Sequence, residues 1–323
     1  MNSLHKYIIK RLLTTIIILF GISVIIFALI NMQPGNPYST MIDPSVPPEV
    51  VKEMLNKIGY YDPIHIKYIK WISRAITGDL GYSIYFGQPV LSVINGRIWN
   101  TILLSVFALI ISIVLGISTG IISAIKEKTL FDNIITVISF MGVSIPAFFL
   151  GLILIKIFSF DLKILPASGM KTLGESYTGL EGIFDLLKHM LLPGLVLAIL
   201  QSTAFIRYTR SSMLEVLGND YIRTARAKGL TKNKAIFKHG LKNALIPIVT
   251  IICLQIPFLF SGALLTETVF VWPGIGRLNY DAVLNRDYPL IMGILMILSI
   301  IILLSNLIAD ILYAIIDPRI RYK

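Results

Sequence analysis

The stretch Asn100–Ile125, NTILLSVFALIISIVLGISTGIISAI, contains no acidic, basic or histidine side chain. At a rise of about 1.5 Å per residue, about 20 apolar residues cross roughly 30 Å of membrane hydrocarbon. The stretch therefore predicts a membrane-spanning helix. Five further runs lack charge in the same way: Leu12–Ile42, Asn133–Ile155, Met190–Ile206, Asn243–Thr266 and Tyr288–Ala309. Met190–Ile206 is short, so we expect its helix to continue to Tyr208. The pattern predicts an all-α integral membrane protein with six spans.

The composition agrees with this fold class. The chain is 55% hydrophobic and only 15% charged, against roughly 45–50% and about 25% in a soluble domain. Its lone cysteine, Cys253, lies within an uncharged run and is interpreted as a small apolar filler. Lys6, Lys10 and Arg11 precede an apolar run too long for a secretory signal, so we expect an uncleaved first helix.

Basic residues in the short connections predict the orientation. Arg207–Lys242 carries nine basic against two acidic residues, and the two ends of the chain carry three basic residues each. Placing these segments in the cytoplasm puts both termini inside, which requires an even number of spans. Asp43–Arg97, with six basic and five acidic residues, then lies outside. The positive charge is explained by topology and anionic lipid, so we expect membrane lipid and no nucleic acid as a partner.

Four segments follow from these boundaries. Residues 1–42 are the N-terminal tail and first span, 43–99 an external segment, 100–317 a core of five spans with the cytoplasmic loop 210–242, and 318–323 a cytoplasmic tail. Within the external segment, the apolar spacing predicts short helices over Glu49–Ile58 and Ile64–Ile76, followed by a turn at Gly78–Gly81. We expect this segment to cap the external mouth.

Proline within a span removes a backbone hydrogen bond and kinks the helix. Pro146, Pro193 and Pro257 all lie in predicted spans. Each kink has two interpretations, helix packing or the shaping of a translocation path. Lys156 and Asp310, near the ends of spans, are open to structural pairing or to contact with a substrate or partner. The candidate path residues are Ser144, Pro146, Gln201, Gln255 and Glu267.

The cytoplasmic loop contains a predicted short helix, Tyr221–Lys228. Asn219 or Asp220 is a suitable N-cap, Gly229 is a suitable stop in the left-handed region, and Thr231 can cap a second helix. Tyr221, Ile222 and Ala225 are expected to share one face of the first helix. Periodicity alone leaves two interpretations, a helix lying on the lipid surface or a knob offered to a cytoplasmic protein.

The sequence of this loop, YIRTARAKGL over Tyr221–Leu230, resembles the EAA loop of ABC-importer permeases. Arg223-Thr224-Ala225 stands where that motif has Glu-Ala-Ala, and Gly229 follows as in the motif. The wording is similar to that of the dipeptide/oligopeptide/nickel permease family, and the long first external segment to its "B"-type subunit. Further stretches resemble this family in the same order: Arg11-Leu12-Leu13, Gln33-Pro34-Gly35-Asn36-Pro37, Tyr61-Asp62-Pro63-Ile64, Gly78-Asp79-Leu80-Gly81-Tyr82-Ser83, Asn100-Thr101, Glu267 to Arg277, and Arg286-Asp287-Tyr288-Pro289.

The resemblance implies a type I ABC importer permease fold in a bacterial inner membrane, forming half of a pore for di- or oligopeptides. The alternative cargo is nickel or another metal chelate. The implied partners are a second homologous permease in a heterodimer, two cytoplasmic ATPases that hold ATP and Mg, and an external substrate-binding protein. The implied ATPase-coupling residues are Tyr221, Ile222, Arg223, Thr224, Ala225, Arg226, Ala227, Lys228, Gly229 and Leu230.

Other classes of function lack their sequence patterns. No G-x-x-x-x-G-K-[ST] phosphate-binding loop occurs, and Gly274-Ile275-Gly276 lacks the third glycine of a dinucleotide site. The four histidines show no metal-binding spacing. We therefore expect no catalytic site, cofactor or metal on this chain. An ATP-independent secondary transporter, the main rival, predicts an inverted repeat and acids at mid-membrane, and neither is present.

Overall fold

The computed structural model describes residues 3–34, 45–231, 234, 236 and 240–316, and this part of the chain is helical, without a strand. The Gly35–Pro37 motif, most of the helix predicted after Thr231 and the tail from Arg319 lie outside it, as do the side chains of Arg226 and Pro257. The elements are α1 Ser3–Asn31, α2 Pro48–Lys57, α3 Ile64–Ile76, α4 Val90–Ile125, α5 Leu130–Ser144, α6 Ala147–Leu154, the π-helix η2 Ile155–Asp161, α7 Gly179–Leu217, α8 Asp220–Ala227, α10 Leu241–Val269, α11 Ile275–Leu284 and α12 Tyr288–Ile316.

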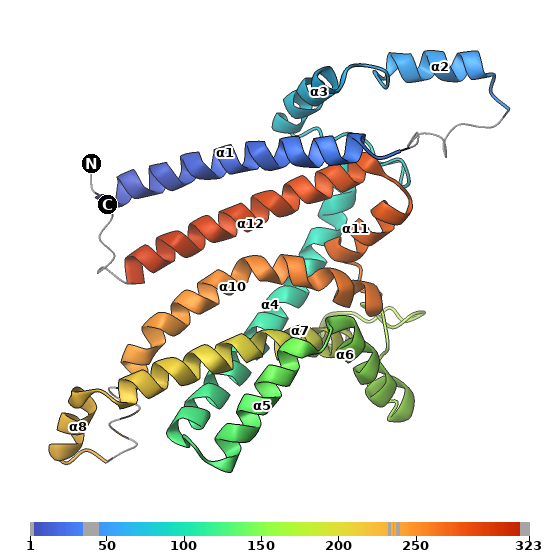
Figure 1. The fold of residues 1–323 in the computed structure, drawn as a ribbon. Helices are drawn as coiled ribbons and strands as arrows, with labels where there is room; N and C mark the ends of the chain where they lie inside the picture. The colour runs from blue at the N-terminus through green and yellow to red at the C-terminus, as the bar shows by residue number, and fades with distance from the viewer. Residues whose placement is uncertain (1–2, 35–44, 232–233, 235, 237–239, 317–323) are drawn as a thin grey trace.

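The long helices form one bundle (Figure 1). Helices α1, α12, α10 and α7 follow one another side by side, and α4 crosses them, packing most extensively on α7. The start of α1, the end of α12 and α8 lie at the same end of the bundle (Figure 1). The side of the membrane on which the termini and the basic loop lie stays a prediction.

Four helices in the described ranges are long and apolar enough to span a membrane alone: Ile8–Asn31, Val90–Ile125, Gly179–Leu217 and Tyr288–Ile311. The bent pair Leu130–Gly142 and Ala147–Asp161 makes a fifth if it is counted as one span. The predicted run Asn243–Thr266 coincides with α10, which is helical over its full length. The helical membrane architecture is thus confirmed, whereas the count of six spans stays a prediction.

The third predicted span is broken at Pro146 rather than kinked. Helix α5 ends at Ser144, Ile145 is extended with φ −83° and ψ 122°, and Pro146 is the N-cap of α6. The two halves meet at 108°. A residue that precedes proline is forced out of the helical region by the proline ring, so the chain leaves the helix at Ile145. In contrast, Pro193 lies inside the continuous helix α7.

Glycines allow α4 and α7 to approach closely. A Cβ atom at Gly116 would lie 2.3 Å from Cβ of Phe205, and one at Gly120 would lie 2.7 Å from Cβ of Thr209. On α7, a Cβ at Gly194 would lie 2.5 Å from the ring of Phe107 of α4. Small residues four apart are a common way for membrane helices to pack, because the backbones themselves come into contact.

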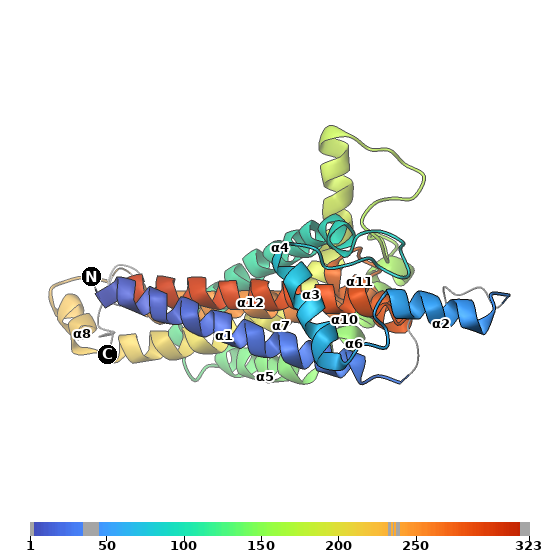
Figure 2. The same ribbon diagram turned by 90° about the horizontal axis from the view of Figure 1, so that it is seen from above.

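The external segment has the two predicted helices, α2 and α3. The bounds predicted for α3 are confirmed, and Gly78 and Gly81 after it both have positive φ. Helix α3 packs on α1 through Tyr68, whose hydroxyl lies 2.8 Å from Ser23 Oγ. Helix α2 extends beyond the bundle (Figure 2). The chain from α3 onward thus packs on the bundle, and the role of this segment as a cap on the external mouth stays a prediction.

Candidate functional site

Helix α8 ends as the sequence predicts. Gly229 has φ +89°, and the N–H of Leu230 donates to the carbonyl of Ala225 at 3.2 Å. This bond between the third residue past the helix and its third-last position defines a Schellman end, which requires a residue in the left-handed region. Beyond it, the N–H of Lys234 donates to Thr231 Oγ1 at 3.5 Å, as expected for a second helix capped by Thr231.

The two sides of α8 differ in burial. Ile222 and Ala225 are only 5% and 9% exposed, so these two face the protein itself. Tyr221, Thr224 and Lys228 are exposed. Of the three residues expected to share a face, Tyr221 is 39% exposed, so only Ile222 and Ala225 are buried. The polar side of α8 is the one available to a partner.

The connection from α7 to α8 is short and hydrogen-bonded. Gly218 N–H donates to Leu214 O at 3.1 Å and Asn219 N–H to Val216 O at 3.1 Å. The last turns of α7 are anchored by Met213 and Val216, which join a buried apolar cluster with Ala124 of α4 and with Ile236, Ala244 and Ile248. Helix α8 therefore follows directly on the packed ends of α4, α7 and α10.

At the opposite end of the bundle, Glu267 of α10 is fully buried. Its carboxylate accepts hydrogen bonds from Thr101 Oγ1 at 2.7 Å and from the N–H of Arg277 at 3.2 Å. Thr101 Oγ1 in turn accepts from the N–H of Ile275 at 2.8 Å. The carboxylate therefore sits at the N-terminus of α11, where unpaired backbone N–H groups favour a negative charge.

Glycines make room for this carboxylate. A Cβ at Gly274 would lie 2.3 Å from the carboxyl group of Glu267, and one at Gly276 would lie 3.0 Å from it. In this conformation Glu267 contacts no open space. The carboxylate joins α10, α11 and α4 here, and its place in a translocation path stays a prediction.

A second contact joins the same two motifs. Trp272, also fully buried, donates from Nε1 to the carbonyl of Asn100 at 3.0 Å, and Asn100 Nδ2 donates to the carbonyl of Pro273 at 2.8 Å. Hydrogen bonds in both directions thus join Asn100-Thr101 to the stretch Glu267–Arg277, although the two are far apart in the sequence.

A similar set of hydrogen bonds involves Asp287, the fully buried residue that precedes α12. Ser83 Oγ donates to its carboxylate, as do the N–H groups of Tyr85 at 3.0 Å and Leu290 at 3.2 Å. The stretch ending at Ser83 and the stretch containing Asp287 are therefore joined in space. Asp287 both caps α12 and fastens the external segment to it.

The remaining candidate path residues are dispersed. Ser144 and Pro146 are exposed at the break between α5 and α6, where Ser144 Oγ donates to Phe140 O at 3.1 Å. Gln201 and Gln255 are half-buried on α7 and α10. The structure does not bring these four together around one cavity, so their role stays a prediction.

Two ionisable residues with open interpretations form ion pairs within the chain. Lys156 Nζ lies 2.7 Å from Asp161 Oδ2, and Arg11 Nη1 lies 3.1 Å from Asp310 Oδ2. The second pair joins α1 to α12 near the end of the bundle that carries α8. Lys156 and Asp310 each have a pairing partner within the chain.

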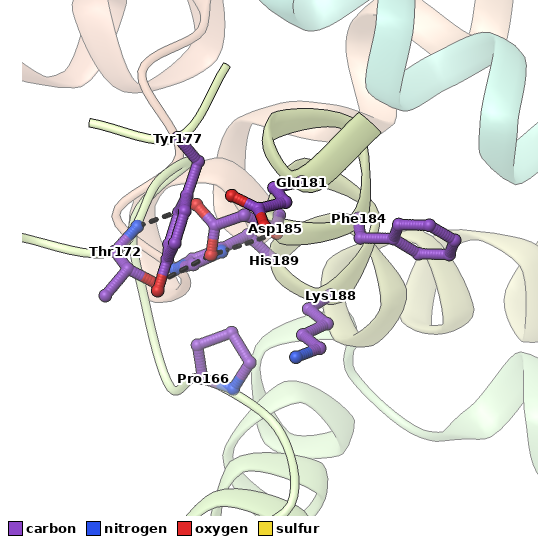
Figure 3. A pocket seen from close by; sticks show the side chains of 8 residues that line it. All are labelled: Pro166, Thr172, Tyr177, Glu181, Phe184, Asp185, Lys188 and His189. Atoms are coloured by element: carbon purple, nitrogen blue, oxygen red, sulfur yellow. Dashed lines mark hydrogen bonds and ion pairs between the residues drawn. The ribbon is translucent and has the colours of Figure 1, made fainter. Parts of the chain in front are cut away.

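A surface pocket of about 340 Å³ lies beside the first turns of α7 (Figure 3). Asp185 receives hydrogen bonds there from the N–H and hydroxyl of Thr172 at 2.9 and 2.6 Å, and His189 Nδ1 lies 2.8 Å from the carbonyl of Asp185. The other lining residues are Pro166, Tyr177, Glu181, Phe184 and Lys188. No predicted path residue lines it. Within the described ranges, no group of three or more His, Cys, Asp or Glu could hold a metal ion.

Sequence reasoning missed one buried ion pair, Asp132 with Arg210. Two nitrogens of Arg210 each lie 2.7 Å from the carboxylate oxygens of Asp132, whose side chain is 3% exposed. A local signal was present, because Thr129 precedes Asp132 by three residues in the spacing of a capping box. Its partner in α7 could not be found without the fold.

Comparison with known proteins assigns the whole chain. Residues 116–322 match the family described as binding-protein-dependent transport system inner membrane component, and residues 4–105 match its N-terminal companion. The chain is 43% identical over 317 residues to the oligopeptide transport system permease protein AppB of Bacillus subtilis, covering 98% of this chain and 99% of AppB.

Two further relatives match at the same coverage, 98% of this chain and 99% of the relative. The dipeptide transport system permease protein DppB of Alkalihalophilus pseudofirmus is 40% identical, and the glutathione transport system permease protein GsiC of Escherichia coli is 38% identical. The resemblance drawn from the motifs is confirmed, and with it the permease fold and the inner-membrane location. The chain belongs to the binding-protein-dependent transport system inner membrane components, the membrane-spanning permease subunits of ABC importers.

Proposed function

We propose that this chain forms half of the translocation pore of an ABC importer for peptides, and that α8 receives the force of ATP-driven closure from a cytoplasmic ATPase. The observation that carries the coupling role is the geometry of α8. It is a short helix with a defined end, joined to α7 by the hydrogen-bonded turn at Gly218 and Asn219. Its residues Ile222 and Ala225 are buried, whereas Tyr221, Thr224 and Lys228 are exposed. Peptide cargo is supported by the names of the relatives, which are permeases for oligopeptides, dipeptides and glutathione, and they favour it over a metal chelate.

The partners follow from this role. We propose a second, homologous permease as the other half of the pore, two ATPases at the α8 end and a substrate-binding protein at the other end. ATP and Mg²⁺ would be held by the ATPases, since this sequence contains no phosphate-binding loop. The chain itself then performs no chemistry. ATP binding would shift the pore between inward and outward openings because the ATPase binds α8 differently in the two states.

A matched pair of threonines tests the docking of α8. Thr224 and Thr77 are both exposed, and each donates its hydroxyl to a carbonyl one turn back, at 2.9 Å to Asp220 O and 2.7 Å to Arg74 O. Thr224 lies on α8, whereas Thr77 ends the external helix α3. Thr224→Glu should reduce the amount of ATPase that co-purifies from detergent-solubilised membranes, and Thr77→Glu should leave it unchanged. Glutamate favours the helix more than threonine, so loss of α8 would not explain the result. Undiminished ATPase with Thr224→Glu would contradict the proposal.

A further inference from the structure

The Asp132 carboxylate is almost enclosed by donors from two helices and the turn between α4 and α5. Arg210 of α7 contributes two nitrogens at 2.7 Å each, the N–H of Lys128 lies at 3.0 Å, and Ser123 of α4 donates its hydroxyl. A bidentate arginine fixes both the distance and the orientation of a carboxylate, which a lysine cannot do. Asp132 therefore ties the α4–α5 hairpin to α7 in one defined arrangement.

Two more contacts join α5 to α7 along the same side. The guanidinium of Arg207, one turn before Arg210, lies 5.4 Å from the ring centroid of Phe140. A Cβ at Gly142 would lie 2.8 Å from Thr203 Oγ1, so the two helices are close there as well. These contacts and the Asp132–Arg210 pair together form the α5–α7 joint. The joint runs from the first turn of α5 to within three residues of its break at Ile145.

The joint lies next to the connection with α8. Arg210 is one helical turn before Met213, whose side chain is fully buried among the cytoplasmic ends of α4, α7 and α10. From there the hydrogen-bonded link at Gly218 and Asn219 leads directly into α8. A displacement of α8 is therefore delivered to the end of α7, and the joint is the contact that passes it to α5.

We propose that Asp132 and Arg210 are positioning residues for coupling, which make α8, the end of α7 and α5 move as one rigid body. Movement of this body would act on the break at Pro146, where α5 and α6 meet. This inference rests on the proposed docking of the ATPase on α8, and it adds the path by which the displacement reaches the membrane-spanning part. A pair with only a structural role would support folding without fixing the relative position of α5 and α8.

Distances between spin labels test this directly in the assembled transporter. In a Cys253→Ser background, labels at Ala227→Cys on α8 and Ile138→Cys on α5 occupy exposed positions. We expect one narrow distance distribution that is unchanged when ATP and vanadate trap the complex. With Asp132→Asn the distribution should broaden before nucleotide is added and shift when it is trapped. Arg210→Lys, which keeps the charge but not the fork, should show the same effect more weakly.

The control is Asp310→Asn, which breaks the ion pair between α1 and α12 near the same end of the bundle. It should leave the α5–α8 distances unchanged. The proposal is overturned if Asp132→Asn and Arg210→Lys keep the narrow distribution in both states, even where they lower thermal stability. It is also overturned if Asp310→Asn broadens the distribution equally. If the ATPase does not dock on α8, the amount of ATPase that co-purifies will be unchanged by Thr224→Glu. In that case the α5–α8 distances measured before nucleotide is added still test the α5–α7 joint.

Discussion

Gly229→Val tests whether the end of α8 depends on a left-handed residue. Gly229 has φ +89°, and a Cβ built there meets no atom within 4 Å. The cost of a side chain is therefore conformational and not a steric clash with neighbours. An L-residue in the left-handed region costs about 1–2 kcal/mol, and a β-branched one is among the least tolerant. The population of correctly ended α8 should fall by up to about 5–30-fold.

The binding-competent fraction sets the apparent affinity, so the dissociation constant of the ATPase should rise by a similar factor. The assay is titration of the purified ATPase onto the permease complex in detergent, with bound ATPase as the signal. Gly229→Asn, which accepts positive φ, should bind nearly as well as glycine. Gly78→Val is the matched control and should leave the ATPase affinity unchanged. Gly78 has φ +88° and ends α3 with the same type of bond, from Asp79 N–H to Arg74 O at 3.0 Å, but it lies at the opposite end of the bundle.

Three results would refute this reasoning. Unchanged ATPase affinity with Gly229→Val would show that the end of α8 does not matter for docking. Equal losses with Gly229→Asn and Gly229→Val would show that the backbone angle is not the cause. A comparable loss with Gly78→Val would place the effect in general destabilisation of the chain.

Two further predictions concern the packing of the bundle. Glu267→Gln should lower the unfolding temperature in detergent, because the new amide group turns a donor toward the N–H and hydroxyl donors that now surround the carboxylate, at a cost of about 1–3 kcal/mol. The control Glu49→Gln, on the exposed helix α2, should leave the unfolding temperature unchanged. Equal unfolding temperatures for the two variants would contradict the role of the buried Glu267 carboxylate in stability. Gly120→Val should separate α4 from α7 and lower the unfolding temperature, since overpacking costs about 1–3 kcal/mol. Gly21→Val should leave the unfolding temperature unchanged, because a Cβ at Gly21 meets no atom within 4 Å. A similar decrease in both variants would show that the close approach of α4 and α7 does not determine the stability.

Local chemistry made several elements predictable. The bounds of α3 follow from Pro63 before it and Gly78 after it, which respectively start and stop a helix. Gly229 marked the end of α8 for the same reason. The uncharged runs located the long helices because a membrane imposes a minimum length. Each of these features depends on residues that are neighbours in the sequence.

The features that could not be predicted depend on partners far along the chain. Asp132 and Arg210 lie on different helices, and nothing in either local sequence indicates the other. The same holds for Thr101 with Glu267, although both lay in stretches that resembled the permease family. The two sides of α8 could not be told apart from the sequence, because the burial of Ile222 and Ala225 depends on the fold of the rest of the chain. The break at Pro146 exceeded the expected kink because the position before proline left the helical region altogether.

The most direct test of the account is photo-crosslinking from α8 in native membranes. A photoreactive amino acid in place of Thr224, exposed on the outward side of α8, should form a covalent product with a protein whose sequence contains the G-x-x-x-x-G-K-[ST] phosphate-binding loop of an ATPase. The same residue in place of Thr77 should not form this product. Crosslinks from position 224 to lipid alone, with no ATPase product, would contradict the claim that this permease is driven through α8.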